Sequence, residues 1–422
     1  MDKPNNSPPE TEHNPSWRLT LVVMSIAQFL SGVGFSFVLP FYPFYFRYLG
    51  VENDKAVFMW IGASSLAFGV TMFFSAPLWG MISDRYGRKI MVLRSMFAGS
   101  VILGLMGLAT NPWHLLILRI LQGMTTGTVS ASVTLVSSIT PSANLGFSLG
   151  ILQTALMIGA SAGPFFGGFL ADTFGFRIPC LIASILLFSA AILVIAGAAE
   201  RFVPPRRTWG AGLRTMKEIL REPGFPVIMI IYFLNYALGT VLVPILPFFI
   251  EMLSGDPSKS STLTGVFLGM TGFISAFSAA YFGKLGDRIG HTKTLVISLV
   301  LAGLFCFPQA MAGSLWMLFI GRCLMGFGAG GIVPSISAMV SKIVQREKVG
   351  SAYGLTSSAT TLGIGVGPFL GGIMASVLGL RWPFVILGGL ILCIALLASK
   401  MVNHQKFGLS YTDADSENEN SD

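Results

Sequence analysis

The chain has 422 residues, of which 53% are hydrophobic and only 11% are charged, and its mean hydropathy is +0.72. A soluble globular domain of this length does not tolerate so apolar a composition, so the chain belongs in a lipid bilayer. The net charge of +8 does not indicate nucleic-acid binding, because the Lys and Arg residues are spread over many loops rather than gathered in one basic face.

Twelve apolar segments are long enough to cross a bilayer, for which an α-helix needs about 20 residues. We therefore predict an all-α integral membrane protein whose twelve transmembrane helices form two pseudo-symmetric six-helix bundles. The first six segments begin near Arg18, Phe58, Ile90, Pro112, Asn144 and Arg177. The second six begin near Pro226, Thr262, Lys293, Ser314, Lys348 and Arg381.

Polar segments flank and separate the two predicted bundles, at 18–200 and 226–402. Residues 1–17 lack the basic start and apolar core of a signal peptide, so we predict a disordered tail there. Residues 201–225 form a basic linker, and 403–422 form an acidic tail. With both termini in the cytoplasm, 20 of the 27 Lys and Arg lie on the inner side, five on the outer side and two within the membrane. This distribution follows the positive-inside rule.

The loop between the second and third helices combines glycines with charged residues. Its distinctive positions are Gly80, Asp84, Arg85, Gly87, Arg88 and Lys89. One interpretation is a conformational latch, in which Asp84 pairs with the neighbouring bundle in one state and releases it in another. The alternative is that the basic residues only fix the topology, since exposed ion pairs contribute about 0 to 1 kcal/mol.

Arg119 lies about seven residues into the fourth predicted helix. A central arginine costs roughly 2.5 to 3.5 kcal/mol on insertion scales, so it needs a partner. We predict that Arg119 faces the interior and couples transport to proton or substrate occupancy, together with Asp84. The alternative is that Arg119 extends to the outer interface, as its counterpart Arg322 would do in the second half.

The fifth predicted helix carries small residues at helical spacing around a proline. The positions are Gly159, Gly163, Pro164, Gly167 and Gly168. Such a helix packs closely against a neighbour and bends, which predicts a hinge. Close packing alone is the alternative explanation.

The second half repeats the motifs of the first half about 203 to 204 positions later. Asp84 corresponds to Asp287, Arg119 to Arg322, and the Gly163-Pro164 pair to Gly367-Pro368. The near-constant offset indicates an internal duplication. Two duplicated membrane bundles that face each other are a common plan of transporters, with the site between them.

No pattern in the sequence indicates an enzyme. The four cysteines show no metal-binding or redox spacing, and neither paired carboxylates nor a nucleophile motif is present. We therefore predict no catalytic residues, no metal site and no cofactor.

The motifs together resemble those of the major facilitator superfamily over almost all of residues 18–402, and most closely those of twelve-helix bacterial drug:proton antiporters. The loop from Gly80 to Leu93 fits the superfamily signature, and Arg119, Gln122 and Gly123 fit that of the fourth helix. The segment from Gly159 to Leu170 is similar to the fifth-helix signature of the antiporters. The resemblance implies export of multiple drugs by alternating access, with the proton gradient as the energy source. In one respect the chain departs from many relatives, because its first and fourth helices contain no carboxylate.

By analogy with that fold, the first and seventh helices line the substrate cavity. Aromatic rings there would bind apolar rings and attract organic cations. Intramembrane amides need a polar partner and are further candidates. The predicted substrate-binding residues are Gln28, Phe35, Phe41, Tyr42, Gln153, Tyr232, Asn235 and Tyr236.

The sequence therefore predicts a monomeric proton antiporter of the bacterial cytoplasmic membrane that exports lipophilic drugs, organic cations among them. Its expected partners are these substrates, protons and membrane lipids, and no nucleic acid. The alternative on the same fold is a carrier of a single endogenous metabolite, such as a sugar, an amino acid derivative or a lipid. A ligand-binding receptor and a lipid scramblase are further alternatives.

Overall fold

The computed structural model describes residues 17–141, 144–200, 217–222, 225–343 and 349–408, except for the side chains at 84, 340–343, 349–353 and 400–408. The described residues form helices joined by short loops, with no strand among them. The predicted linker and tails fall largely outside these ranges, so the domain boundaries stay predictions. Asp84 lies in a described helix, but its side chain is outside the description.

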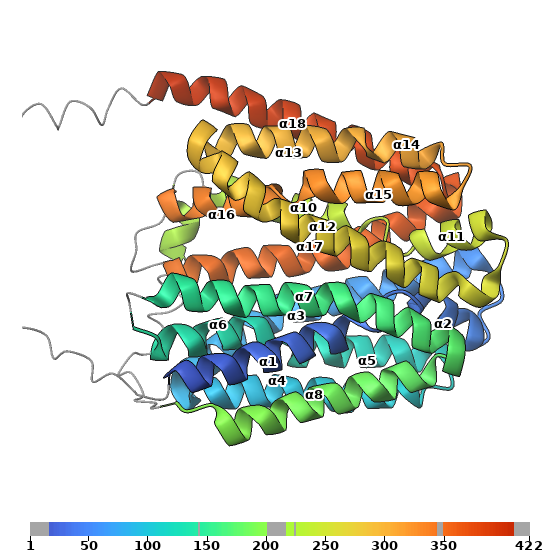
Figure 1. Cartoon of the computed structure of the whole chain (residues 1–422), viewed down its shortest axis with the longest axis horizontal. Helices are drawn as coiled ribbons and strands as arrows, with labels where there is room; N and C mark the ends of the chain where they lie inside the picture. Colours follow the sequence, from blue (N-terminus) through green and yellow to red (C-terminus); the bar gives the residue numbers. More distant parts are fainter. Residues whose placement is uncertain (1–16, 142–143, 201–216, 223–224, 344–348, 409–422) are drawn as a thin grey trace, which may run out of the picture.

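In the first half, each predicted span is one helix or an interrupted pair (Figure 1). The elements are α1 (Trp17–Ser36), α2 (Tyr42–Tyr48), α3 (Asp54–Tyr86), α4 (Arg88–Gly107), α5 (Pro112–Thr125), α6 (Thr128–Ile139), α7 (Leu145–Phe174) and α8 (Arg177–Gly197).

The second half repeats this order after the short helical segment 217–221. Its elements are α10 (Phe225–Thr240), α11 (Leu246–Ser254), η2 (Pro257–Lys259), α12 (Ser260–Ile289), α13 (His291–Leu304), α14 (Cys306–Ala310), α15 (Leu315–Ala329), α16 (Ile332–Ile343), α17 (Val349–Leu378) and α18 (Trp382–Gly408).

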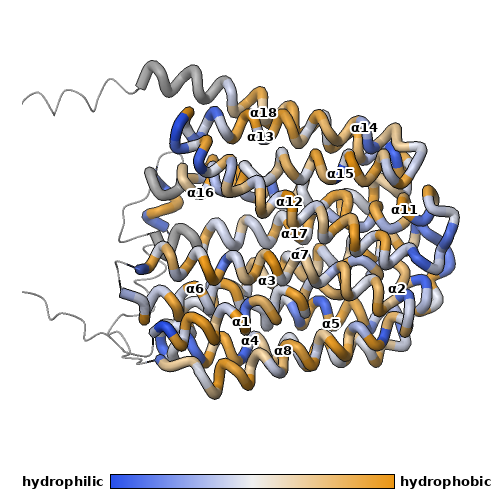
Figure 2. The backbone as a smooth tube through the Cα atoms, in the orientation of Figure 1, coloured by the Kyte–Doolittle hydropathy of each residue, from blue (hydrophilic) through white to orange (hydrophobic). Residues whose placement is uncertain are grey.

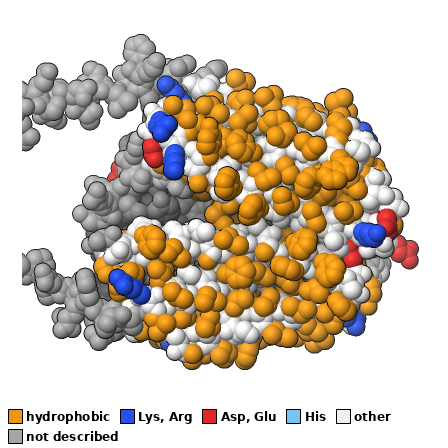
Figure 3. All heavy atoms as spheres, in the orientation of Figure 1, with side chains coloured by type: hydrophobic (Ala, Val, Ile, Leu, Met, Phe, Trp, Pro, Cys, Tyr) orange, Lys and Arg blue, Asp and Glu red, His pale blue; other side chains and the backbone are white. Residues whose placement is uncertain are grey.

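Twelve spans follow from these helices, which confirms the predicted fold class. Among the described residues, ten helices are long and apolar enough to cross a membrane. The fourth span is the pair α5 and α6, and the seventh is α10 with α11, so neither is one long helix. Hydrophobic residues follow the helices along their length, and hydrophilic ones gather at the two ends of the bundle (Figure 2). The space-filling view shows the same apolar belt (Figure 3).

The interruptions have local causes. Pro43 and Pro247 occupy the first turn of α2 and α11, so the first and seventh spans break at equivalent positions of the repeat. The fourth span breaks where Thr126 is extended and Gly127 has a φ of +139°, a conformation that favours glycine.

Two helix crossings join the halves, α3 with α17 and α7 with α12. In the first, a Cβ on Gly365 would lie 2.7 Å from the Cα of Gly69, so the two backbones are in contact. Farther along the same helices, a Cβ on Gly80 or on Gly354 would have no neighbour within 4 Å among the described residues. The crossing is therefore tight as far as the middle of the two helices and open toward one end of the bundle. We call the open end, where α1 begins, the inner end, after the orientation that the charges predict.

The tight crossing generates a prediction with a control on the same helix. Gly365→Val would force atoms into occupied space, at a cost of about 1 to 3 kcal/mol. Gly354→Val makes the same chemical change where space is open. We expect Gly365→Val to lower the melting temperature of the purified protein by about 2 °C or more, and Gly354→Val to leave it within error. Equal melting curves for the two variants would contradict this account of the closure.

Candidate functional site

An ion pair closes the outer end of the interface between the halves. The Nη1 atom of Arg47, at the end of α2, donates to both carboxylate oxygens of Glu251 in α11, at 2.7 and 2.9 Å. Arg47 also pairs with Asp54 of its own half at 2.8 Å. Its guanidinium lies 4.4 Å from the ring centre of Phe248. Arg47 and Glu251 are equivalent positions of the repeat, so their pairing places them at the pseudo-twofold axis.

A second polar contact closes the other crossing. Asp172, near the outer end of α7, accepts from the backbone N–H and hydroxyl of Thr262, each at 2.6 Å, and from the backbone N–H of Ser261 at 3.3 Å. A carboxylate at a helix N-terminus is favoured by the exposed N–H groups and the helix dipole. Neither outer contact is among the residues predicted from the sequence. The 204-residue offset between Arg47 and Glu251 is the signal that could have identified the first.

Toward the inner end, the halves separate. A wide, open depression of about 470 Å³ lies along the inner part of α7, and the residues that line it come from this helix alone. Its lining residues are Phe147, Gly150, Ile151, Thr154, Ala155 and Ile158. The predicted substrate residue Gln153 is exposed on the same helix. The described residues thus show an outer end that is closed and an inner end that is open.

The loop between α3 and α4 binds within its own half. Glu200, after α8, accepts from the backbone N–H groups of Arg88 and Lys89, both at 2.8 Å. The Nζ atom of Lys89 donates to the carbonyl of Ala198 at 2.6 Å. Gly87 has a φ of +101°, which lets the chain turn between the helices. The side chain of Asp84 is outside the described set, and Arg85 is exposed, so the latch stays a prediction.

Arg119 is half-buried and lies over an aromatic ring. Its Nη1 atom donates to Oε1 of Gln122 at 3.0 Å, and its guanidinium is 4.5 Å from the ring centre of Tyr42. The counterpart Arg322 is 6% exposed. Among the described residues, neither arginine pairs with a carboxylate. The coupling role of Arg119 stays a prediction, but its partners are an amide and a phenol ring.

The glycines of α7 lie in two tight crossings. A Cβ on Gly159 or Gly163 would collide with α1, one on Gly167 with the backbone of the residue that follows α1, and one on Gly168 with Ser261 of α12. The copies in α17 pack in the same way against the first helix of the second half and α3. Helix α7 continues through Pro164. Close helix packing therefore explains why these positions are glycine. The hinge role stays a prediction.

Four of the predicted substrate residues in the first half have structural contacts or lie inside the bundle. Phe41 is buried and stacks on Phe176 at 5.9 Å. The hydroxyl of Tyr42 donates to Ser64 at 3.1 Å. Phe35 packs beside Gly99, within the first half. Gln28 is fully buried, and neither its amide nitrogen nor its amide oxygen has a partner among the described residues.

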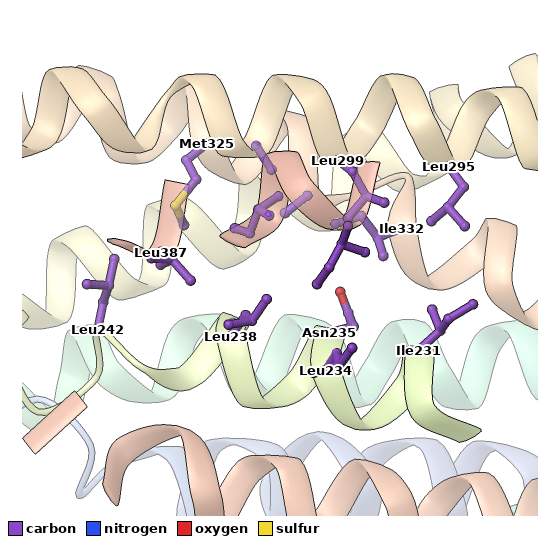
Figure 4. Close-up of a pocket in the computed structure, with 15 residues that line it drawn as sticks. Ile231, Leu234, Asn235, Leu238, Leu242, Leu295, Leu299, Met325, Ile332 and Leu387 are labelled. Carbon is purple, nitrogen blue, oxygen red and sulfur yellow. The ribbon is translucent and has the colours of Figure 1, made fainter. Parts of the chain in front are cut away.

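The candidates in α10 lie within the second half. Tyr232 shares a hydrogen bond of 2.9 Å with Ser337 of α16, and Tyr236 packs beside Gly363 of α17. Asn235 points into an apolar cavity between α10, α13, α15, α16 and α18 (Figure 4). This cavity has a volume of about 70 Å³, whereas drug-sized sites occupy roughly 300 to 1,000 Å³. The structure therefore does not bring the predicted residues together into one pocket, and their substrate role stays a prediction.

Comparison with known families and curated proteins gives one consistent result. The family described as "Major Facilitator Superfamily" matches residues 24–278 and 228–409. The chain is 31% identical over 398 residues to "Multidrug resistance protein MdtG" of Salmonella typhimurium, covering 93% of this chain and 98% of the relative. The protein of the same name from Salmonella newport matches to the same extent.

Solved structures show the same fold at lower identity. The human organic anion transporter MFSD10 (TETRAN) aligns with a TM-score of 0.69 at 19% identity, over 91% of this chain and 100% of that chain. A bacterial homolog of the human lysosomal transporter Spinster, in an inward-facing and unoccupied conformation, aligns with a TM-score of 0.73 at 15% identity, over 92% and 98%.

The outer ion pair generates a prediction with a chemically matched control. Glu251→Gln removes the charge that bridges the halves, whereas Asp54→Asn removes a charge that binds Arg47 within one half. We expect Glu251→Gln to increase the population with an open outer end and Asp54→Asn to change it little. The measurement is the distance distribution between spin labels at Lys55 and Lys259, which are exposed on opposite halves.

The labels require a background in which the four native cysteines are replaced by alanine. Longer distances in Glu251→Gln alone are the expected result. Unchanged distances in Glu251→Gln, or the same shift in Asp54→Asn, would show that the interhalf ion pair does not hold the outer end closed.

Proposed function

The chain belongs to the Major Facilitator Superfamily, and from this premise we propose that it is a secondary active transporter that exports lipophilic drugs by proton antiport. The observation that carries the proposal is the 31% identity to multidrug resistance proteins over 98% of their length. The protein is a multi-pass membrane protein of the cytoplasmic membrane, and we propose that both termini lie in the cytoplasm. It acts as a transporter rather than as an enzyme, and as a monomer.

Alternating access is supported by the unequal packing of the two ends. The outer end is held by the Arg47–Glu251 pair and by Asp172 on α12. At the inner end, a Cβ on Gly80 of α3 or on Gly354 of α17 would meet no atom of the described residues within 4 Å. A substrate from the cytoplasm or the inner leaflet would enter this open end, and rocking of the halves would then open the outer end. The loop from Gly80 to Lys89 would stabilise the closed inner end in that second state.

The positions of the acidic residues limit where a coupling proton can bind. The acidic residues near the ends of the described spans are Asp54, Asp84, Asp172, Glu251 and Asp287, and the middle of the described spans contains none. We propose that Arg119 senses substrate or proton occupancy through Gln122 and the ring of Tyr42, both of which it contacts. A guanidinium keeps its charge at all physiological pH values, so Arg119 would respond to a proton bound elsewhere and would not carry it.

Transport in everted membrane vesicles tests the proposal. Respiration acidifies the lumen, so an exporter driven by protons accumulates a neutral lipophilic fluorescent dye inside. We expect accumulation to stop when a protonophore is added. Arg119→Ala should lower the initial rate about tenfold or more, because the charge between Gln122 and Tyr42 is lost. Lys293→Gln, which removes an exposed charge at the inner end of α13, should not lower it.

Two outcomes would contradict the proposal. Equilibration of the dye without a gradient would indicate a facilitator or a scramblase. Transport of one metabolite, with no competition by varied lipophilic compounds, would indicate a dedicated carrier. In each variant, the amount of folded protein in the membrane must be measured by size-exclusion chromatography, so that a lost rate is not a lost protein.

A further inference from the structure

The break in the fourth span leaves backbone groups that lipid cannot satisfy. Helix α5 ends at Thr125 and α6 begins at Thr128. Three side chains satisfy carbonyls at the end of α5. Ser75 donates to Gly123 at 2.8 Å, Trp79 donates through Nε1 to Met124 at 2.6 Å, and Arg94 donates through Nη1 to Thr125 at 2.8 Å. The carbonyl side of the break is therefore paired.

On the other side of the break, the backbone N–H groups that begin α6 have no such side-chain partners among the described residues. No side chain caps the N-terminus of α6. Thr128, its first residue, is 2% exposed, and its hydroxyl has no partner among the described residues. An uncapped helix N-terminus carries a partial positive charge and free N–H donors, which favour an anion.

Arg94 adds a full positive charge at the same place. Its guanidinium carbon lies over Trp79, 3.4 Å from the ring centre, and Nη2 would be 3.7 Å from a Cβ on Gly127. The Nε atom is buried and has no partner among the described residues. In the part of the chain that the structure describes, no carboxylate forms an ion pair with Arg94. A cation, a helix N-terminus and a free hydroxyl thus converge with no negative charge among the described residues to balance them.

Thr128 itself is buried, but the neighbouring exposed face of α6 carries hydroxyl groups. Its exposed residues include Ser130, Thr134 and Ser138, whereas those of α5 include Ile117 and Leu121. Hydroxyl-bearing residues are expected on a surface that faces a water-filled cleft, and apolar residues on one that faces lipid. Since the inner end is open between the halves, the N-terminus of α6 is reached from the cytoplasmic side.

The internal repeat shows that this charge is peculiar to the first half. By the 203-residue offset, Arg94 corresponds to Ile297 and Trp79 to Phe282. Gly127 corresponds to Gly330, which keeps a right-handed helical conformation between α15 and α16. The second half therefore has neither the cation nor the positive-φ break. A feature needed only for packing would be expected in both copies.

We propose that Arg94 and the N-terminus of α6 bind the acidic group of an amphiphilic organic anion, and that such anions are substrates of the transporter. The inference rests on the proposed export function and names its substrate class. It favours lipophilic anions over the organic cations that the aromatic residues suggest. Three of the aromatic rings near the charged groups are already covered by the protein's own arginines: Tyr42 by Arg119, Phe248 by Arg47 and Trp79 by Arg94.

Binding of three probes that differ only in charge tests the site. The probes are a dansyl-undecanoic acid, its primary amide and the corresponding alkylammonium compound. The full chain is placed in nanodiscs of phosphatidylcholine, and Kd is measured from dansyl fluorescence. We expect the acid to bind about tenfold more tightly than the amide and the ammonium compound. Arg94→Gln should raise the Kd of the acid to that of the amide and leave the amide unchanged.

Two further variants keep the test decisive where Arg94→Gln does not fold. Ser130→Asp puts a carboxylate in the exposed first turn of α6, where it suits the helix but repels an anion, so the acid alone should bind more weakly. Lys293→Gln removes an exposed cation elsewhere and should change no Kd. Each probe also partitions into the lipid. The ratio of its Kd values in two variants does not depend on this partitioning. Equal Kd values for the three probes, or tighter binding of the ammonium compound, would overturn the proposal.

The source of the acidic group is tested by adding phosphatidylglycerol to the nanodiscs. Retained binding of the acid supports a soluble substrate, and complete competition by the lipid would show a lipid headgroup site instead. Transport separates this inference from the proposed function. Export of the amide without preference for the acid would refute the anion site and leave drug export standing. Selective binding of the acid without export of any probe would leave the site standing and refute the transport proposal.

Discussion

The close approach of α3 to α17 and of α7 to α12 is the constraint on which the rest of the structure depends. Lipid offers no hydrophobic drive for two helices to associate, so membrane helices rely on small residues that let their backbones touch. Gly69 with Gly365, and Gly168 with Ser261, provide such contacts from the outer end to the middle of these helices. Because the halves touch there, Arg47 reaches Glu251 and Asp172 reaches α12, and the inner end remains open.

The bilayer also explains the side chains that surround the broken spans. Every backbone group freed by a break must find a partner inside the protein. In the fourth span, Ser75, Trp79 and Arg94 supply donors to one side of the break and none caps the other. In the tenth span, Gly330 and Gly331 keep the chain helical enough that Gly330 donates to Gly326 and Ser335 to Gly331. The two halves thus solve one geometric problem differently, and only the break in the fourth span has an arginine, Arg94, among its hydrogen-bond donors.

Much of the fold could be predicted because membrane helices have a strong composition signal and the repeat fixes their number. Pro43 and Pro247 begin α2 and α11 at equivalent positions of the repeat, so the cause of the breaks in the first and seventh spans is visible in the sequence. The site was less predictable, because periodicity does not say which face of a helix meets the cavity. Phe41 is an aromatic residue near a proline, but it is buried against Phe176. In the sequence, Arg94 is one of the inner basic residues that fix topology, since no local pattern marks the break in the fourth span beside which it lies.

The membrane potential and the charges inside the described spans both favour an anionic substrate. The middle of these spans contains no carboxylate to balance its arginines. When an anion leaves a cell whose interior is electrically negative, about 2.3 kcal/mol of free energy is released per charge for each 100 mV of membrane potential. A proton that enters in exchange adds its own charge in the same electrical sense. Export of an acid therefore draws more on the potential than export of a cation does, for which the two electrical contributions oppose each other. A positive interior that holds Arg94, Arg119 and Arg322 suits the first case and repels the second.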